Sequence, residues 1–136
     1  MTNINDFNDQ MIEQFRANGG RLEFGPASLL LLTTTGAKSG RKRVSPLAVF
    51  DDDGRIYVIA SKGGAPAHPA WFHNLVANPT VNVEHSGESY DAKASVVPDD
   101  QHDELYARIA ERFPQFGEYQ RKTTRKIPVI ALERVG

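Results

Sequence analysis

The chain has no cysteine among its 136 residues. This absence excludes disulfide bonds, a thiolate nucleophile, and any zinc or iron–sulfur site that depends on cysteine ligands. A chain without cysteine fits a reducing cytoplasm, and we expect a cytoplasmic location. The histidines show no metal-ligand spacing, so we expect no bound metal; they are His68, His73, His85 and His102.

Long apolar runs are also absent. Runs such as Leu29–Leu32 are far shorter than the about 20 residues that a membrane-spanning helix needs. The first ten residues, MTNINDFNDQ, lack the basic start and the apolar run of a signal peptide. We therefore expect no integral membrane segment, and peripheral contact with a membrane stays open.

An excess of charge of one sign is the third missing feature. The chain has 16 Lys and Arg residues against 17 Asp and Glu residues, which gives a net charge of −1. A near-neutral chain has no overall attraction for nucleic acid, and the acidic run 51–53 argues further against such a partner. Against this neutral background, a local cluster of cations stands out.

Such a cluster occupies residues 36–43, which we call the basic loop. The apolar and β-branched run Leu29–Thr35 predicts a strand before it, and a second strand resumes through Val44 and Leu47. The loop carries cations, a hydroxyl and glycines but no acid, which suits an anion. The alternative is a solvated hairpin loop. A Walker phosphate loop is excluded, because no helix follows the lysine.

Apolar spacing predicts the remaining elements of a single domain over residues 1–136. An amphipathic helix is expected over 5–18, within an N-terminal helical segment 1–20. The other expected elements are strands at 44–50 and 55–61 around an Asp-Gly turn, a helix at 68–75, a hairpin at 81–83 and 90–96, a helix at 99–113, and a last strand at 126–132. Pro128 indicates an edge strand or a bulge there.

This tally gives about six strands that hairpins join, so the sheet is mainly antiparallel. The predicted fold class is α+β: a split β-barrel with an N-terminal helix and further helices covering the barrel openings.

Four segments closely resemble one family. They are LLLTTTGAKSGRKRVSP at 30–46, ASKGG at 60–64, PAWFHNLVANP at 69–79 and YQRKTTRKIPV at 119–129. Together they resemble the deazaflavin-dependent nitroreductases of actinobacteria, whose members use coenzyme F420 on a split β-barrel. The match runs from about residue 25 to the C-terminus, in order and at the family's spacings. The resemblance implies an enzyme that passes hydride from reduced F420 to an electron-poor conjugated acceptor: a quinone, an enone or unsaturated lactone, or a nitroaromatic.

The resemblance also implies cofactor-binding residues. F420 joins a flat deazaflavin ring to a polyanionic phosphate and oligoglutamate tail, which the basic loop would bind. The implied contacts are Lys38, Ser39, Arg41, Arg43, Val44, Ser45, Pro46, Leu47, Ala48, Ile59, Ala60, Ser61, Lys62, Gly63, Trp71, Phe72, His73 and Asn74. Trp71 has an alternative role in ordinary core packing. The histidines other than His73 are interpreted as surface or loop residues.

Ser61 and Tyr119 match polar positions of the family's active site, so we expect them to donate hydrogen bonds or a proton. Alternatively, Ser61 ends a strand and Tyr119 anchors a helix. The expected substrate pocket comprises Ala48, Phe113, Phe116 and Tyr119. The first three stand where the best-known nitroimidazole-activating member has tyrosines. We therefore expect bulky quinones or conjugated carbonyl compounds to be better acceptors than nitroimidazoles.

Three alternatives remain open at this stage. A split barrel can bind FMN instead of F420, or can hold F420 without catalysis. A small β-barrel with basic loops can also bind single-stranded nucleic acid. A second basic cluster is interpreted as solvated surface or as an extension of the anion-binding rim: Arg121, Lys122, Arg125 and Lys126. The oligomeric state is left open.

Overall fold

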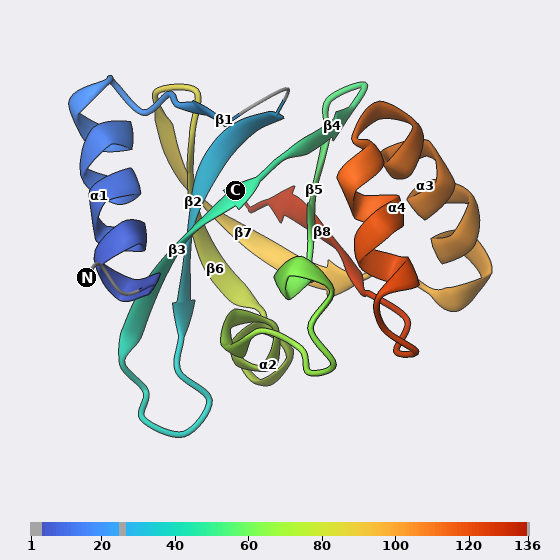
Figure 1. Cartoon of the computed structure of the whole chain (residues 1–136). Helices are drawn as coiled ribbons and strands as arrows, with labels where there is room; N and C mark the ends of the chain where they lie inside the picture. The colour runs from blue at the N-terminus through green and yellow to red at the C-terminus, as the bar shows by residue number, and fades with distance from the viewer. Residues whose placement is uncertain (1–3, 25–26, 136) are drawn as a thin grey trace.

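A computed structural model describes residues 4–24 and 27–135 (Figure 1). Its helices are α1 (Ile4–Ala17), a 3₁₀ turn (Lys62–Gly64), α2 (Ala70–Ala77), α3 (Asp99–Arg112) and α4 (Pro114–Arg121). Its strands are β1 (Glu23–Phe24), β2 (Ala27–Thr35), β3 (Lys42–Ala48), β4 (Phe50–Asp52), β5 (Arg55–Ile59), β6 (Thr80–His85), β7 (Glu88–Val96) and β8 (Val129–Arg134).

All strand pairings among these elements are antiparallel. The order is β1-β2-β6-β7-β8-β5-β4, and β3 pairs with the free side of β2. Only Val49 separates β3 from β4, so this segment crosses from β2 to β5 and closes the sheet into a split barrel. The predicted α+β split barrel is confirmed. The described residues form eight strands rather than about six, because β1 is added and the segment predicted at 44–50 divides at Val49.

Two apolar cores lie on opposite faces of the sheet. The barrel interior contains Leu30, Leu32 and Val58, and α2 covers it with Trp71 and Leu75. The outer core lies under α3 and α4 and includes residues of both helices and of β4, β5 and β8. Strand β5 contributes to both cores, which confirms the expectation that it is apolar on both sides.

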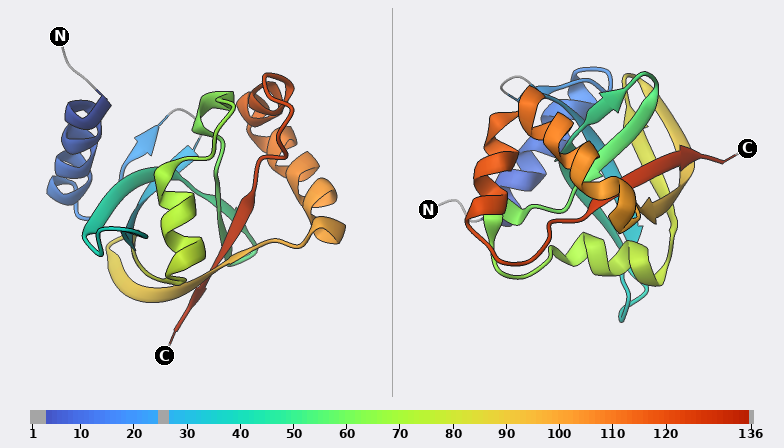
Figure 2. Two further views of the ribbon diagram at one scale, coloured as in Figure 1. Left: turned by 90° about the horizontal axis from the view of Figure 1, so that it is seen from below. Right: turned by 90° about the vertical axis from the view of Figure 1, so that its right-hand side faces the viewer.

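Helix α1 and the α3–α4 pair lie on opposite sides of the barrel (Figure 2). The helix predicted at 5–18 is confirmed as α1, and its Phe15 side chain is buried. Arg16 of α1 forms an ion pair with Glu84 of β6, at an Nη2–Oε2 distance of 3.0 Å. None of the helices in the described part of the chain is long and apolar enough to cross a bilayer.

Strand β8 corrects the expectation for Pro128. β8 lies between β5 and β7 and is therefore an interior strand, so the prediction of an edge or bulge was wrong. Pro128 immediately precedes the first strand residue, where the ladder needs no donor from it. Its carbonyl still accepts a hydrogen bond from the Ala60 N–H at 2.9 Å.

Candidate active site

The basic loop is tightly turned. The Gly36 N–H donates to the Arg41 carbonyl at 2.8 Å, and the Gly40 N–H donates to the Gly36 carbonyl at 3.0 Å. The Ser39 hydroxyl accepts from the Arg41 N–H at 3.1 Å. From α2, the Asn74 amide oxygen accepts from the Ala37 N–H at 3.0 Å. The loop is thus braced internally and fixed to α2.

The cations of this loop point into solvent. Lys38, Arg41 and Arg43 are exposed, and their side chains form neither a salt bridge nor a hydrogen bond with any residue that the structure describes. Lys42 differs, because its Nζ donates to the Thr35 hydroxyl at 2.9 Å. Two cations on the braced loop, and Arg43 at the start of β3, therefore remain available for an anion.

The predicted contacts 44–48 do not share one face. In register with β2, Leu47 lies opposite Leu30 and packs against the barrel interior. Val44 lies on the opposite face and lines a cavity of about 490 Å³ beside α1. Ala48 packs against the outer core. Because strand side chains alternate, only part of this run can face a single ligand with its side chains.

Ser61 follows β5 and begins an unusual turn. The serine is 8% exposed. The next three residues have φ values of 47° for Lys62, 63° for Gly63 and 84° for Gly64, all in the left-handed region. Glycine adopts this region freely, whereas Lys62 is strained there. A Cβ on Gly64 would lie 2.8 Å from the Tyr119 carbonyl oxygen, so the turn packs directly on α4. The fold therefore brings the Ser61 segment to the helix that carries Tyr119.

Tyr119 is half-buried on α4 and packs against the outer core, with its ring centroid 5.7 Å from that of Phe116. Its hydroxyl has no hydrogen bond to any residue in the described ranges, so it does not anchor the helix there. The four expected pocket residues belong to the same core or pack against it: Ala48, Phe113, Phe116 and Tyr119. Both phenylalanines are 5% exposed and act there as packing residues.

The α2 residues separate into different roles. Trp71 is 9% exposed and lies in the barrel interior, as the core-packing interpretation expects. Besides its bond to Ala37, Asn74 donates to the Thr34 hydroxyl at 3.3 Å. Phe72 is half-buried, and His73 is exposed. Of the predicted contacts on α2, Phe72 and His73 are therefore the side chains with surface left and no hydrogen bond to a described residue.

Arg125 is the residue that sequence reasoning missed. The second basic cluster was interpreted as solvated surface or as an extension of the anion-binding rim, but Arg125 is half-buried and donates four hydrogen bonds. Its acceptors are the carbonyls of Ala60, Ser61 and Ala65 and the Nδ1 atom of His68. The only sequence signal is its position inside the YQRKTTRKIPV segment. This arginine fixes the segment from Ser61 to the start of α2.

His68 and His85 make the stability depend on pH. Burial, followed by the charge of Arg125 and the proximity of His73, lowers the pKa of His68, and burial also lowers the pKa of His85. Their contribution to the free energy of unfolding is thus full above the ordinary histidine pKa of about 6.5. It falls as the pH drops below this value, because the unfolded state then binds protons first.

We therefore expect the melting temperature to fall between pH 7 and pH 5, above the range in which most carboxylates titrate. Thermal scans at half-unit pH steps measure this slope. His68→Gln should reduce the slope, and His73→Gln should reduce it less, because it removes only the smallest of the three causes that lower the pKa of His68. Equal slopes in the wild type and in His68→Gln would contradict the assignment.

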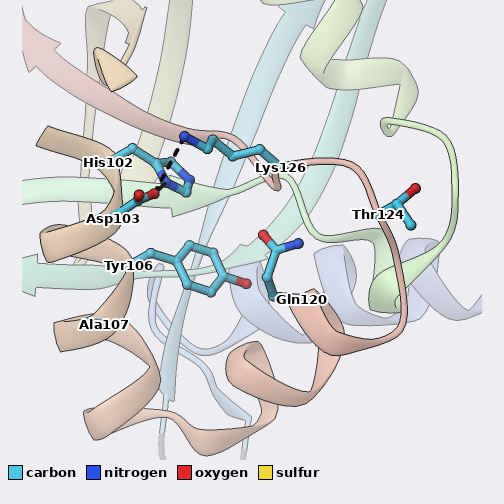
Figure 3. A pocket seen from close by; sticks show the side chains of 7 residues that line it. All are labelled: His102, Asp103, Tyr106, Ala107, Gln120, Thr124 and Lys126. Carbon is cyan, nitrogen blue, oxygen red and sulfur yellow. Dashed lines mark hydrogen bonds and ion pairs between the residues drawn. The ribbon is translucent and has the colours of Figure 1, made fainter. Parts of the chain in front are cut away.

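A cavity of about 430 Å³ lies between α3, α4 and the segment that leads to β8 (Figure 3). His102 lines it and is 4% exposed, so its interpretation as a surface residue was wrong. Its Nε2 atom lies 2.6 Å from the Ile127 carbonyl. Gln120 uses both amide atoms, since it donates to the Arg125 carbonyl and accepts from the Ile127 N–H.

Tyr106 lines the same cavity and donates its hydroxyl proton to the Phe116 carbonyl at 2.7 Å, and burial raises its pKa to about 12. Because these polar groups already have hydrogen-bond partners, we interpret the cavity as part of the structural contact between α3, α4 and the segment that leads to β8. Of the predicted cofactor contacts, Val44 alone lines either of the two cavities described here. No group of three or more metal-ligating side chains occurs in the described ranges.

The fold and the exposed cations define a split barrel with a cationic loop. The sequence model of the F420H(2)-dependent quinone reductase family matches residues 7–134. An F420H(2)-dependent quinone reductase of Mycobacterium tuberculosis is 38% identical over 121 residues, which cover 85% of this chain and 79% of the relative. The chain therefore belongs to this family: it is an oxidoreductase with reduced F420 as its hydride donor.

Solved structures agree. An F420-H2 dependent reductase, FDR-A, is 42% identical with a TM-score of 0.69, over 77% of this chain and 93% of that one. A structure described as a domain-swapped dimer is 38% identical with a TM-score of 0.72, over 92% of each chain. The resemblance to F420-dependent reductases that the four sequence segments indicated is confirmed.

Proposed function

We propose that this chain is a quinone reductase that binds F420H2 through the basic loop and the Ser61 turn. The observation that carries the proposal is a set of three exposed side chains without a partner among the described residues: Lys38 and Arg41 on a braced loop, and Arg43 at the start of β3. They fit a phosphate and an oligoglutamate tail, because both groups need several cations with directional donors.

Reduced F420 supplies the hydride when it is bound. The chain's own residues hold the partners in place and supply the proton that completes hydroquinone formation. Tyr119 is the proposed donor, from its phenolic oxygen to the quinone oxygen, because no described residue occupies its hydroxyl. The Ser61 hydroxyl is the proposed hydrogen-bond partner beside it. The Tyr119 side chain packs against the outer core, which holds its ring in place.

The side chains near Tyr119 support the choice of acceptor. Ala48, Phe113 and Phe116 are apolar, so these three residues add no hydroxyl for a nitro group beyond those of Tyr119 and Ser61. A flat, bulky quinone, enone or unsaturated lactone fits such surroundings better than a nitroimidazole. Within this class we propose quinones as the main acceptors, in line with the family to which the chain belongs.

A fluorescence titration of the protein with oxidised F420, with FMN in parallel, tests the cofactor. Saturable binding of F420 and weak binding of FMN are expected, followed by turnover of F420H2 with a panel of quinones, enones and nitroimidazoles. Tight FMN binding without F420 binding would refute the proposal. Binding without turnover of any acceptor would reduce the protein to an F420 carrier.

Tyr119→Phe tests the proton donor. We expect turnover with a quinone to fall by about tenfold, less than is usual for a general acid because water can replace the phenol. The affinity for F420 should stay nearly unchanged. Tyr90→Phe, on β7, is the matched control and should retain full turnover. A large loss of F420 affinity in Tyr119→Phe would instead make this tyrosine a cofactor ligand.

A further inference from the structure

The guanidinium of Arg125 is bonded on all sides by one short segment. It donates to the carbonyls of Ala60 at 3.1 Å, Ser61 at 2.8 Å and Ala65 at 2.9 Å. Its Nη1 atom also lies 2.9 Å from Nδ1 of His68. Lysine, with a compact ammonium group, could not reproduce this fork of donors. Arg125 therefore sets the orientation of several successive peptide groups at once.

The peptide groups that Arg125 binds through their carbonyls carry their N–H groups on the opposite side. All described peptide bonds are trans, so the N–H of each peptide points opposite to its carbonyl. Since Arg125 binds the Ala60 and Ser61 carbonyls, it turns the N–H groups of Ser61 and Lys62 away from itself. Neither N–H donates a hydrogen bond to another residue within the described ranges. Two backbone donors are thus aimed outward and left available.

The local backbone suits an electron-rich oxygen. Ser61 is right-handed, with φ −78° and ψ −38°, and Lys62 is left-handed, with φ 47°. Successive residues of opposite hand make their N–H groups converge on one concavity, which binds anions and carbonyl oxygens. The strain at Lys62 is of the kind found at ligand-binding turns. The cation of Arg125 lies behind this concavity and compensates the carbonyls that face it.

Arg125 also links the turn to α4. Its own carbonyl accepts from the Gln120 side chain at 2.7 Å, and Gln120 directly follows Tyr119. The turn itself touches the same helix, because Gly64 packs against the Tyr119 carbonyl. One arginine thus joins the peptide groups after β5, the entry to α2 and the helix of the proposed proton donor.

We propose that Arg125 is a positioning residue, which through the Ala60 and Ser61 carbonyls aims the N–H groups of Ser61 and Lys62 at a carbonyl oxygen of the deazaflavin ring. This inference rests on the proposed function, since it assigns the ring to the Ser61 turn. Two fixed donors hold the ring in the plane that hydride transfer needs. Arg125 itself touches neither the cofactor nor the acceptor.

Titration of ¹⁵N-labelled protein with oxidised F420 tests the donors directly. The amide resonances of Ser61 and Lys62 should move on binding, whereas those of Lys93 and Glu133, on β7 and β8, should not. In Arg125→Gln these two movements should shrink. Arg55→Gln, at an exposed position of β5, is the matched control and should behave like the wild type.

Kinetics supply the second readout. A misplacement of the reacting groups by about 1 Å costs about 100-fold in rate. Arg125→Gln should therefore lower kcat by about that factor. The KM for F420H2 should rise much less, because the basic loop still binds the tail. Compared with Arg125→Gln, Arg125→Lys should recover more of the wild-type melting temperature than of the wild-type kcat. A loss of stability with an unchanged kcat would assign a purely structural role to Arg125 and overturn the proposal.

The wild-type titration keeps the test decisive if both variants fail to fold. Saturable F420 binding with stationary Ser61 and Lys62 resonances would overturn this inference and leave the proposed function standing. Absence of F420 binding by the wild type would overturn the proposed function itself.

Discussion

Replacing Lys38, Arg41 and Arg43 together by glutamine is expected to weaken F420 binding by about a thousandfold. Hydrogen bonds to charged groups contribute about 1.5–3 kcal/mol each, and exposed side chains reach the lower end of that range. Three lost contacts therefore cost about 4 kcal/mol, which corresponds to about three orders of magnitude in Kd. The fluorescence titration measures this change.

Salt dependence and a charge-matched variant separate local contacts from overall charge. The control replaces three exposed cations that lie outside the proposed site: Arg21→Gln, Arg55→Gln and Lys93→Gln. It changes the net charge by the same amount but should keep the wild-type Kd within a small factor. Wild-type affinity should fall between 50 and 300 mM salt, since exposed ion contacts are screened over about 10 Å. The triple variant of the basic loop should lose most of this salt dependence.

Two results would contradict this prediction. Equal losses in both triple variants would mean that the cofactor responds to overall charge rather than to the loop. Unchanged affinity in the basic-loop variant would place the tail elsewhere. Fluorescence of the bound ring also distinguishes a displaced tail, which leaves the ring signal in place, from a cofactor that no longer binds.

Local patterns predicted the strands and cores well. The run Leu29–Thr35 combines apolar and β-branched residues, and it forms most of β2, with partners on both sides. The alternation in β5 predicted burial on two faces because side chains of a strand alternate strictly. The Asp-Gly turn between β4 and β5 places φ at 55° for Asp53 and 91° for Gly54, as a tight hairpin requires.

Polar residues with distant partners could not be predicted in this way. Arg125 looks like one member of a surface cluster, yet its acceptors lie 57 to 65 residues away along the chain. His102 occurs among acidic residues of α3, but it bonds the Ile127 carbonyl across 25 residues. Such contacts depend on how β8 returns between β5 and β7, and no local periodicity encodes that pairing.

In the candidate site, too, some features follow from the sequence and others depend on the tertiary fold. The family resemblance supplied the segments, while the sheet decides which face each residue takes. Val44 faces the cavity beside α1, and Trp71 is packed inside the barrel, although both belong to the predicted contacts. Within residues 4–24 and 27–135, the basic loop, the Ser61 turn and Tyr119 retain polar groups without a partner. We therefore keep them as the proposed site.

Gly64→Ala is expected to destabilise the protein and to disturb the site together. The new Cβ would lie 2.8 Å from the Tyr119 carbonyl oxygen, and the backbone there has φ +84°. A left-handed non-glycine residue costs about 1–3 kcal/mol, and relief of the backbone contact adds to it. A total near 3 kcal/mol corresponds to a fall of about 10 °C in melting temperature for a chain of this length.

Gly63→Ala is the matched control, because it separates the cost of a left-handed backbone from the cost of the contact with the Tyr119 carbonyl. Gly63 also has a positive φ, of 63°, but a Cβ there meets nothing within 4 Å. Its cost should be the conformational part alone, about 1–2 kcal/mol. Beyond the conformational cost that both variants share, only the methyl group of Gly64→Ala pushes the Ser61 turn away from α4. Equal losses in both variants would mean that the turn and Tyr119 are not in contact, and the proposed pairing of Ser61 with Tyr119 would then fail.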